Sequence, residues 1–292
     1  MLISGKTMLA VANKYNFAVP AFNVSNYAMS NGLFEICEEK RAPWIIAIHP
    51  DEIAHTGDDV IVALRERAHR SSVPVAIHWD HGGTYEQILT AIKVGFTSVM
   101  IDGSMLPFEK NIAITKRVVD TAHAVGLSVE GELGTIGKTD EQAEAGTDDI
   151  IYTEPAQAAE FVERTGVDSL AIAIGTRHGL YPATLKPELR IGLLQEIKNL
   201  VGVPLVLHGG SNNPDAEIEQ SVTYGINKIN ISSDIKVAYF DAMRDVLKNR
   251  DLREPLTIEP PAINVMKRVA AQKLDLFHTT DKAHLYSRFQ TQ

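Results

Sequence analysis

Three histidines stand where apolar runs give way to polar residues, and they carry the strongest chemical signal in this chain. His81 and its neighbour Asp80 follow the run Val73–Ile77, and His178 and His208 follow two later runs. Neutral imidazole is the commonest metal ligand among side chains, and a carboxylate can transfer a proton. Three imidazoles with an open fourth position make a catalytic zinc site. The alternative for any one histidine is a hydrogen bond to a neighbouring carbonyl.

The segments that must position these residues alternate between short apolar runs and stretches with helical spacing. Each run has the length of a buried parallel strand. Eight strands alternating with helices predict a (β/α)8 barrel (TIM barrel) of class α/β, a single domain over residues 1–292 with extra N- and C-terminal helices. A doubly wound sheet is the alternative, but no GxGxxG follows the first strand. The predicted strands are Phe17–Val24, Pro43–His49, Val73–Ile77, Ser98–Asp102, Leu127–Leu133, Ser169–Gly175, Pro204–His208 and Ile226–Ile231.

Several boundaries between elements are marked by single residues. Thr84 and Gln87 have the spacing of a capping box at a helix start. The helix after the seventh strand is expected to place Pro214 in its first position, and the last helix is expected to begin at about Pro261. The connection Gly134–Tyr152 is polar and long, which predicts a mobile functional loop.

A barrel would bring the chemical residues together, because the C-terminal ends of its strands form the face that carries the active site. The three histidines would reach this face from strands three, six and seven. His78 is expected inside the barrel, below the aspartate, in a structural role. The same face would also receive the carboxylates Asp80, Asp102, Glu130 and Glu132.

Strands seven and eight each end in small and hydroxyl residues. The first sequence is His208-Gly209-Gly210-Ser211, and the second is Asn230-Ile231-Ser232-Ser233. Phosphate binds in many barrels on the loops after these two strands and at a helix N-terminus. Each loop alone would also fit an ordinary turn with an N-cap serine. The pair beside a metal site predicts a phosphate site.

Composition limits the partners. The chain has 292 residues, 45% of them hydrophobic, a net charge of −9 and a single cysteine, Cys37. The acidic balance argues against nucleic acid or an anionic membrane as a partner. One cysteine excludes an internal disulfide framework. No secretory leader and no apolar run of about 20 residues is found, so a cytoplasmic protein is expected.

Together these motifs are similar to the class II, metal-dependent ketose-bisphosphate aldolases, nearest the branch that includes tagatose-bisphosphate aldolase. The resemblance covers nearly the whole chain and is specific for the family more than for the substrate. It is carried by the strings VPAFNV (19–24), HWDHG (78–82), SVMIDGS (98–104), VEGELG (129–134), AIAIGTRHG (171–179), PLVLHGGS (204–211) and KINISSD (228–234).

The resemblance implies a role for each matching residue. It implies that His81, His178 and His208 hold Zn²⁺, with Asp102 and Glu132 as alternative ligands. Asp80 matches the carboxylate that transfers a proton, and an acid of the loop after strand five, Asp140 or Glu141, is the candidate that protonates C3. A monovalent cation such as Na⁺ is expected near the phosphate. The residues matching the dihydroxyacetone-phosphate cradle are Gly179, Gly209, Gly210, Ser211, Asn230, Ser232 and Ser233.

The implied activity is zinc-dependent, reversible aldol cleavage of a phosphorylated ketose to dihydroxyacetone phosphate and an aldehyde. The expected partners are a small sugar phosphate and further copies of the chain, in a homodimer or homotetramer. A Schiff-base aldolase would need a buried lysine such as Lys228, and the metal set argues against it. A zinc-dependent hydrolase could use the same barrel, but strand one has no HxH pair. A non-catalytic sugar-phosphate-binding or assembly subunit could also retain the barrel, although it would not need the acid Asp80.

The chain departs from the family pattern around the aldehyde half of the substrate. His49 stands at the tip of strand two, where relatives often have a small hydroxyl residue. Trp79 lies beside Asp80, Arg177 precedes His178, and Asn212 follows Ser211 in place of glycine. These departures predict an acceptor pocket of altered shape and charge. The alternative is neutral drift at the rim.

Overall fold

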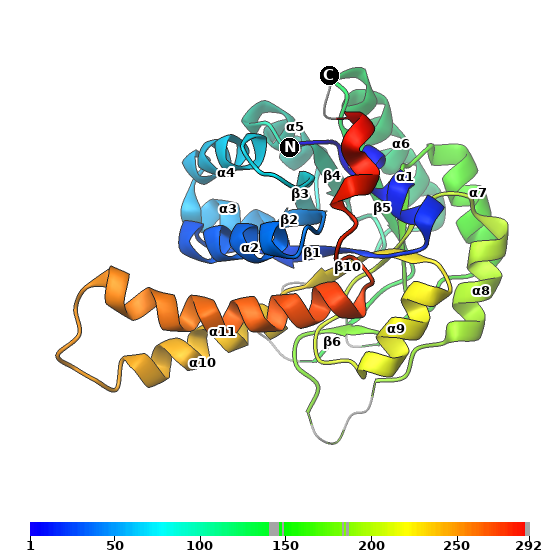
Figure 1. Ribbon diagram of the computed structural model, residues 1–292. Coiled ribbons are helices and arrows are strands. Elements are labelled where there is room, and N and C mark those ends of the chain that lie inside the picture. Colours follow the sequence, from blue (N-terminus) through cyan, green and yellow to red (C-terminus); the bar gives the residue numbers. More distant parts are fainter. Residues whose placement is uncertain (140–145, 148, 183, 185–186, 290–292) are drawn as a thin grey trace.

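Eight parallel strands close into a barrel in the order β1-β10-β9-β7-β5-β4-β3-β2, which confirms the predicted fold (Figure 1). The structure is a computed structural model and describes residues 1–139, 146–147, 149–182, 184 and 187–289. The barrel strands are β1 (Val19–Asn23), β2 (Trp44–Ile48), β3 (Val75–Gly82), β4 (Ser98–Ile101), β5 (Ser128–Leu133), β7 (Ser169–Ile172), β9 (Leu205–Leu207) and β10 (Ile226–Ile231).

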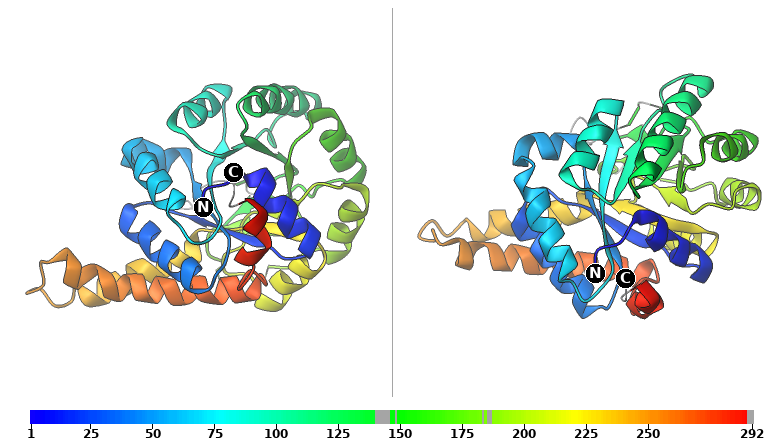
Figure 2. Two further views of the ribbon diagram at one scale, coloured as in Figure 1. Left: turned by 45° about the horizontal axis from the view of Figure 1, so that its top comes forward. Right: turned by 90° about the horizontal axis from the view of Figure 1, so that it is seen from above.

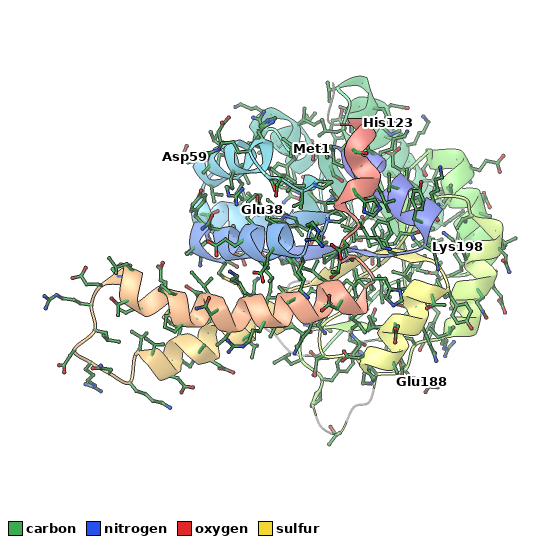
Figure 3. All side chains as sticks on the ribbon, in the orientation of Figure 1. Met1, Glu38, Asp59, His123, Glu188 and Lys198 are labelled. Carbon is green, nitrogen blue, oxygen red and sulfur yellow. The ribbon has the colours of Figure 1, made fainter. Side chains whose placement is uncertain are left out.

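Helices form an outer ring around the strands (Figure 2). Glu38 on α2, His123 on α6 and Lys198 on α8 mark three places on this ring (Figure 3). The helices are α1 (Gly5–Tyr15), α2 (Tyr27–Glu39), α3 (Pro50–Thr56), α4 (Asp59–His69), α5 (Tyr85–Val94), α6 (Phe108–Ala124), α7 (Pro155–Thr165), α8 (Ile191–Leu200), α9 (Asp215–Thr223), α10 (Ser233–Val246), α11 (Pro255–Leu276) and the 3₁₀ helix η1 (Ala283–Phe289).

Two predicted boundaries were wrong. Pro214 is the N-cap of α9 and precedes its first residue, with extended backbone at φ −59° and ψ 128°. Helix α11 begins at Pro255 and contains Pro260 and Pro261 in its interior. Proline removes a backbone donor from a helix interior, and here both prolines lie near the exposed N-terminal end of the helix, where Leu256 and Thr257 face solvent.

The apolar core has two parts. The larger part lies between the strands and the outer helices. The smaller part closes the N-terminal end of the barrel, where Met8 and Leu9 of α1 pack with Tyr286 of η1. Gly5 allows this close approach, because a Cβ atom there would lie 2.7 Å from the hydroxyls of Ser98 and Ser128. Among the described residues, the N-terminal end of the barrel is thus filled by side chains of α1 and η1.

Helices α10 and α11 pack against each other and project beyond the barrel as an arm (Figures 1 and 2). The base of α11 packs on α2, where a Cβ atom on Gly32 would lie 2.6 Å from the side chain of Ile263. Across the described part of the chain, no helix combines the length and the apolar character needed to cross a membrane.

Candidate active site

A bulge near the end of β3 turns two consecutive residues toward the barrel axis. Successive side chains of a regular strand point to opposite faces. In β3 the register with β4 shifts by one residue between Trp79 and Gly82. Within this shift His81 adopts the left-handed conformation, at φ 53°. A non-glycine residue in this conformation costs energy and is enriched at functional sites. Asp80 and His81 therefore both line the cavity.

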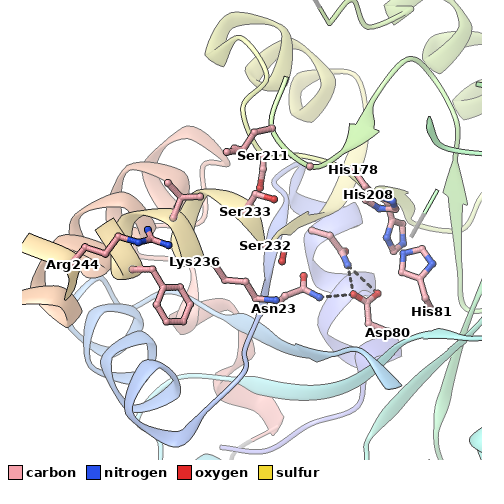
Figure 4. Close-up of a pocket in the computed structure, with 16 residues that line it drawn as sticks. Asn23, Asp80, His81, His178, His208, Ser211, Ser232, Ser233, Lys236 and Arg244 are labelled. Atoms are coloured by element: carbon pink, nitrogen blue, oxygen red, sulfur yellow. Dashed lines mark hydrogen bonds between the residues drawn. The ribbon is translucent and has the colours of Figure 1, made fainter. Parts of the chain in front are cut away.

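The three predicted histidines meet at this cavity (Figure 4). One ligand nitrogen from each of His81, His178 and His208 lies within 4.8 Å of the others. The ring of His81 is 4.5 Å from that of His208 and 5.2 Å from that of His178. Three imidazoles from three separate segments thus face one point, as a metal ion requires.

The hydrogen bonds of His81 and His208 test whether the residues fit a metal. His81 Nδ1 bonds to Asp102 Oδ2 at 3.0 Å, and His208 Nε2 bonds to Glu130 Oε1 at 2.8 Å. The other nitrogen of each ring is buried and has no hydrogen-bond partner in the part of the chain that the structure describes. A buried polar atom without a partner is unfavourable. Two such nitrogens beside a third imidazole fit a metal ion.

The electrostatic field also favours a cation at this point. Burial lowers the pKa of His81, but Asp80 and the hydrogen bond to Asp102 raise it more strongly, to about 10. By contrast, burial and the nearby His81 lower the pKa of His208. The surrounding carboxylates therefore attract one positive charge to His81, which a proton or a metal ion can supply.

A second possible ligand group shares His81. Ligand atoms of His81, Asp102 and Glu132 also lie within 4.8 Å of one another. Burial and the neighbouring Asp102 raise the pKa of Glu132 well above its usual range. Repulsion between two carboxylates this close is relieved either by a proton on one of them or by a cation between them. The geometry therefore fits the alternative metal position that the family resemblance implies.

Asp80 is held by two side-chain amides, one from β1 and one from β10. Asn23 Nδ2 donates to Asp80 Oδ2 at 2.7 Å, and Asn230 Nδ2 lies 3.0 and 3.1 Å from the two oxygens (Figure 4). Burial raises the pKa of Asp80, but His81 and other nearby cations lower it well below the usual range. Asp80 is therefore ionised in this environment. Asn23 was not among the predicted site residues, although it lies in the string VPAFNV.

The cavity has a volume of about 280 Å³ and reaches from the histidines to the N-terminus of α10. Six of the seven predicted phosphate-cradle residues line it. The seventh, Gly210, packs against β10, where a Cβ atom would lie 2.4 Å from the side chain of Ile229. The lining cradle residues are Gly179, Gly209, Ser211, Asn230, Ser232 and Ser233.

The geometry of the two loops suits an anion. Ser211 Oγ accepts a hydrogen bond from the backbone N–H of Asp234 in the first turn of α10. Helix N-termini bind anions through their N–H groups and the helix dipole. Gly209 has φ 64°, and a Cβ atom there would lie 2.6 Å from the carbonyl of Arg177. Glycine is therefore required where this loop approaches the neighbouring one.

Beyond the cradle the cavity continues along α10. Lys236, Phe240 and Arg244 line it at intervals of four residues, on one face of the helix. Lys236 Nζ also lies 2.9 Å from Glu52 Oε1. Sequence reasoning missed these residues. Their regular spacing after Ser233 was the available signal, because a helix that begins at a phosphate loop can present one face to the substrate.

Loop β5–α7 is attached to the segment that carries His178. Strand β6 (Gly137–Lys138) pairs with β8 (Arg177–His178), and Thr139 donates to the carbonyl of His178 through its N–H and its hydroxyl at 2.9 and 2.8 Å. The predicted loop acids Asp140 and Glu141 lie outside the described residues.

The family departures do not all face the cavity. Trp79 points outward and packs edge-on against Phe96, so the expectation that it shapes the acceptor pocket was wrong. Arg177 covers Gly137, and the Asn212 side chain bonds to the carbonyl of Tyr181. Of these four residues, His49 has its ring beside the histidine cluster, 6.3 Å from that of His81.

Fold and site together describe a parallel barrel whose cavity is lined by a histidine cluster, a buried carboxylate and two loops rich in glycine and serine. The chain matches the family "Fructose-bisphosphate aldolase class-II" over residues 3–282. It is 41% identical over 270 residues to the D-tagatose-1,6-bisphosphate aldolase subunit GatY of Klebsiella oxytoca, covering 92% of this chain and 94% of the relative.

Solved structures agree. The YdjI aldolase of Escherichia coli K12 is 36% identical, with a TM-score of 0.84 over 97% of this chain and 100% of that chain. A putative fructose-1,6-bisphosphate aldolase of Coccidioides immitis is 27% identical, with a TM-score of 0.85 over 96% and 98%. The chain belongs to the class II fructose-bisphosphate aldolase family and is an enzyme of the aldolase type.

Proposed function

We propose that this enzyme is a zinc-dependent aldolase that reversibly cleaves a phosphorylated ketose to dihydroxyacetone phosphate and an aldehyde. One observation carries the proposal. The three-histidine cluster, the ionised Asp80 and the phosphate-type loops line a single cavity of about 280 Å³. A sugar phosphate has a polyol end and an anionic end, and the two ends of this cavity are complementary to them.

The proposed cleavage needs a proton acceptor near the C4 hydroxyl of the ketose. His81, His178 and His208 would hold a zinc ion, which when bound would supply a Lewis acid for the ketose carbonyl. Asp80 accepts the hydroxyl proton, because it is ionised and its oxygens are oriented by Asn23. In the reverse direction the same carboxyl returns the proton to the aldehyde oxygen.

The anionic end of the substrate is oriented by the loops. We assign the phosphate to the end of the cavity that Ser211, Ser232 and Ser233 line at the start of α10, where Ser211 Oγ accepts from the N–H of Asp234. Asn230 Oδ1 is buried and has no hydrogen-bond partner among the described residues. We assign this oxygen to a substrate hydroxyl, since Asn230 Nδ2 is already bound to Asp80.

Metal analysis and retro-aldol assays test the proposal. The protein is expected to carry one tightly bound Zn²⁺ per subunit and to lose activity on exhaustive chelation. His178→Ala is expected to lose metal and activity together. His69→Ala, an exposed histidine at the end of α4, is the matched control and keeps both. Full activity without stoichiometric metal would reject the proposal, and metal-dependent hydrolysis without aldol cleavage would favour a hydrolase.

The proposal includes a homodimer or homotetramer. Leu247, the C-cap of α10 on the arm that projects from the barrel, is an exposed apolar residue, and Val237 and Phe240 of α10, which also line the cavity, are partly exposed as well. The Klebsiella relative is itself named a subunit. Light scattering is expected to give a multiple of the chain mass, reduced in Leu247→Asp. Val62→Asp, an exposed position on α4, is the control that leaves the mass unchanged. A wild-type monomer would contradict this part.

Three expectations stay predictions. A monovalent cation such as Na⁺ would bind through backbone carbonyls near the phosphate. The cytoplasm stays the expected location, and Asp140 or Glu141 stays the expected acid that protonates C3.

A further inference from the structure

A row of buried polar groups crosses the barrel directly beneath the histidine cluster. Lys228 Nζ donates to both oxygens of Glu130 at 2.9 and 2.7 Å, and Glu130 Oε1 lies 2.8 Å from His208 Nε2. On the other side, Lys228 Nζ is 3.3 Å from His78 Nε2, and His78 Nδ1 is 2.7 Å from Ser98 Oγ. Lys228, Glu130, His78 and His208 are each no more than 1% exposed.

The fold alone does not explain this row. Interior layers of such barrels are usually filled by branched apolar side chains. A buried ion pair contributes little net stability, because removing both charges from water is expensive. The pair also does not bind substrate directly, since neither Lys228 nor Glu130 lines the cavity. Lys228 is no Schiff-base nucleophile in this geometry, because its amine is engaged by Glu130.

Glu130 determines which nitrogen of His208 is available. Both Glu130 oxygens accept hydrogen bonds from Lys228, so the carboxylate acts toward His208 as an acceptor. His208 Nε2 must then carry the proton, and the lone pair lies on Nδ1. That nitrogen is the buried atom without a partner among the described residues, and His208 belongs to the three-histidine group. At His81 the two ring nitrogens have the opposite roles: Nδ1 bonds to Asp102, and Nε2 is the atom without a partner among the described residues.

We propose that Glu130 and Lys228 are positioning residues that fix the tautomer and ring orientation of His208, so that its Nδ1 is presented to the metal ion. Lys228 acts through Glu130 by holding both carboxylate oxygens in place. The inference rests on the proposed metal dependence of the enzyme. Hydrogen-bond partners of metal-binding histidines typically change metal affinity by 10–100-fold when removed.

Competition between the protein and a chromogenic chelator for Zn²⁺ tests the proposal without an activity assay. Glu130→Gln and Lys228→Met are each expected to weaken Zn²⁺ binding by about 10–100-fold. The double variant is expected to bind no more weakly than Glu130→Gln, because the lysine acts through the glutamate. Asp168→Asn is the matched control. This buried carboxylate bonds to His123 and the N–H of Val129, away from the cavity, so its loss leaves Zn²⁺ affinity unchanged.

A second measurement needs no variant. In ¹⁵N-histidine-labelled wild-type protein loaded with Zn²⁺, long-range ¹⁵N–¹H correlation is expected to show His208 protonated at Nε2 and metal-bound at Nδ1. The opposite tautomer would overturn the proposal, as would single variants with wild-type Zn²⁺ affinity or losses that add in the double variant. A wild-type protein that binds no Zn²⁺ would instead overturn the proposed function, and this inference with it.

Discussion

The side-chain amide of Asn230 lies 3.0 and 3.1 Å from the two carboxylate oxygens of Asp80, across the barrel from β10 to β3. A second amide, from Asn23, reaches Oδ2. Both amides donate, so the site is built for a group at position 80 that only accepts. A carboxylate meets this requirement with both oxygens, whereas the amide of an asparagine at position 80 has only one oxygen that accepts.

Asp80→Asn is expected to retain fold and metal but to lose cleavage by about 10²–10⁴-fold, the usual range for a general acid–base group. Exchange of the C3 proton of dihydroxyacetone phosphate should survive better, because that reaction has no C4 hydroxyl to deprotonate. Steady-state cleavage and tritium or deuterium exchange measure the two reactions. Equal losses in both would show that Asp80 does not act on the C4 proton.

Sequence periodicity predicted the barrel and the convergence of the three histidines because both depend on local signals. Strands end where apolar runs end, and a closed parallel barrel brings those ends to one face. The same period of two also places Trp79 outside the barrel once His78 and Asp80 lie inside. The prediction that Trp79 shapes the acceptor pocket was wrong because the alternation along β3 directs its side chain away from the barrel interior, against Phe96.

The hydrogen-bond partners could not be predicted from the sequence, because they depend on the register between strands that are distant along the chain. Asn230 and Asp80 are 150 residues apart, and Lys228 and Glu130 are 98 residues apart. The bulge that turns His81 inward is likewise a property of the β3–β4 pairing. Residue type predicted the three histidines as ligands, whereas the hydrogen bonds that distinguish their ring nitrogens required the structure.

Ser211→Asp is expected to raise KM for the phosphorylated substrate at least tenfold with a smaller effect on kcat. The new carboxylate would occupy the start of α10 and repel the phosphate, since like charges in a poorly hydrated site interact strongly. Asn212→Asp adds the same charge one residue away, at an exposed position that does not line the cavity. Equal KM changes in both variants would indicate a general charge effect and would show that the phosphate does not bind at Ser211.

Zinc binding is expected to release about one proton per site at neutral pH. Burial lowers the pKa of His81 but nearby carboxylates raise it to about 10, so the ring is protonated in the metal-free protein near pH 7. A metal ion must displace that proton, and affinity should therefore rise with pH until about pH 10. Calorimetry in buffers of different ionisation enthalpy measures the release. A pH-independent affinity between pH 6 and 9 would contradict this assignment.

The last prediction concerns the aldehyde half of the substrate. His49 caps α3, with Nδ1 accepting from the N–H of Asp51 at 3.2 Å, so Nε2 carries the proton of the neutral ring. Its ring lies beside His81, at the tip of the strand next to β3. A bulky imidazole here changes both the size and the hydrogen bonding of the acceptor side. We therefore expect dihydroxyacetone phosphate to remain the donor while the preferred aldehyde is a polar or acidic sugar other than glyceraldehyde 3-phosphate.

An aldol-addition screen against a panel of aldehydes, scored by kcat/KM, tests this expectation. Glyceraldehyde 3-phosphate ranking first at about 10⁴ M⁻¹s⁻¹ or more, a normal value for an enzyme and its substrate, would show an ordinary bisphosphate aldolase. The variant His49→Ser tests whether His49 itself determines the aldehyde preference. Serine is also a good N-cap, so α3 should persist while the imidazole is removed. If His49 determines the preference, His49→Ser shifts the ranking toward glyceraldehyde 3-phosphate by about tenfold, the effect of roughly 1.4 kcal/mol of differential binding in the transition state.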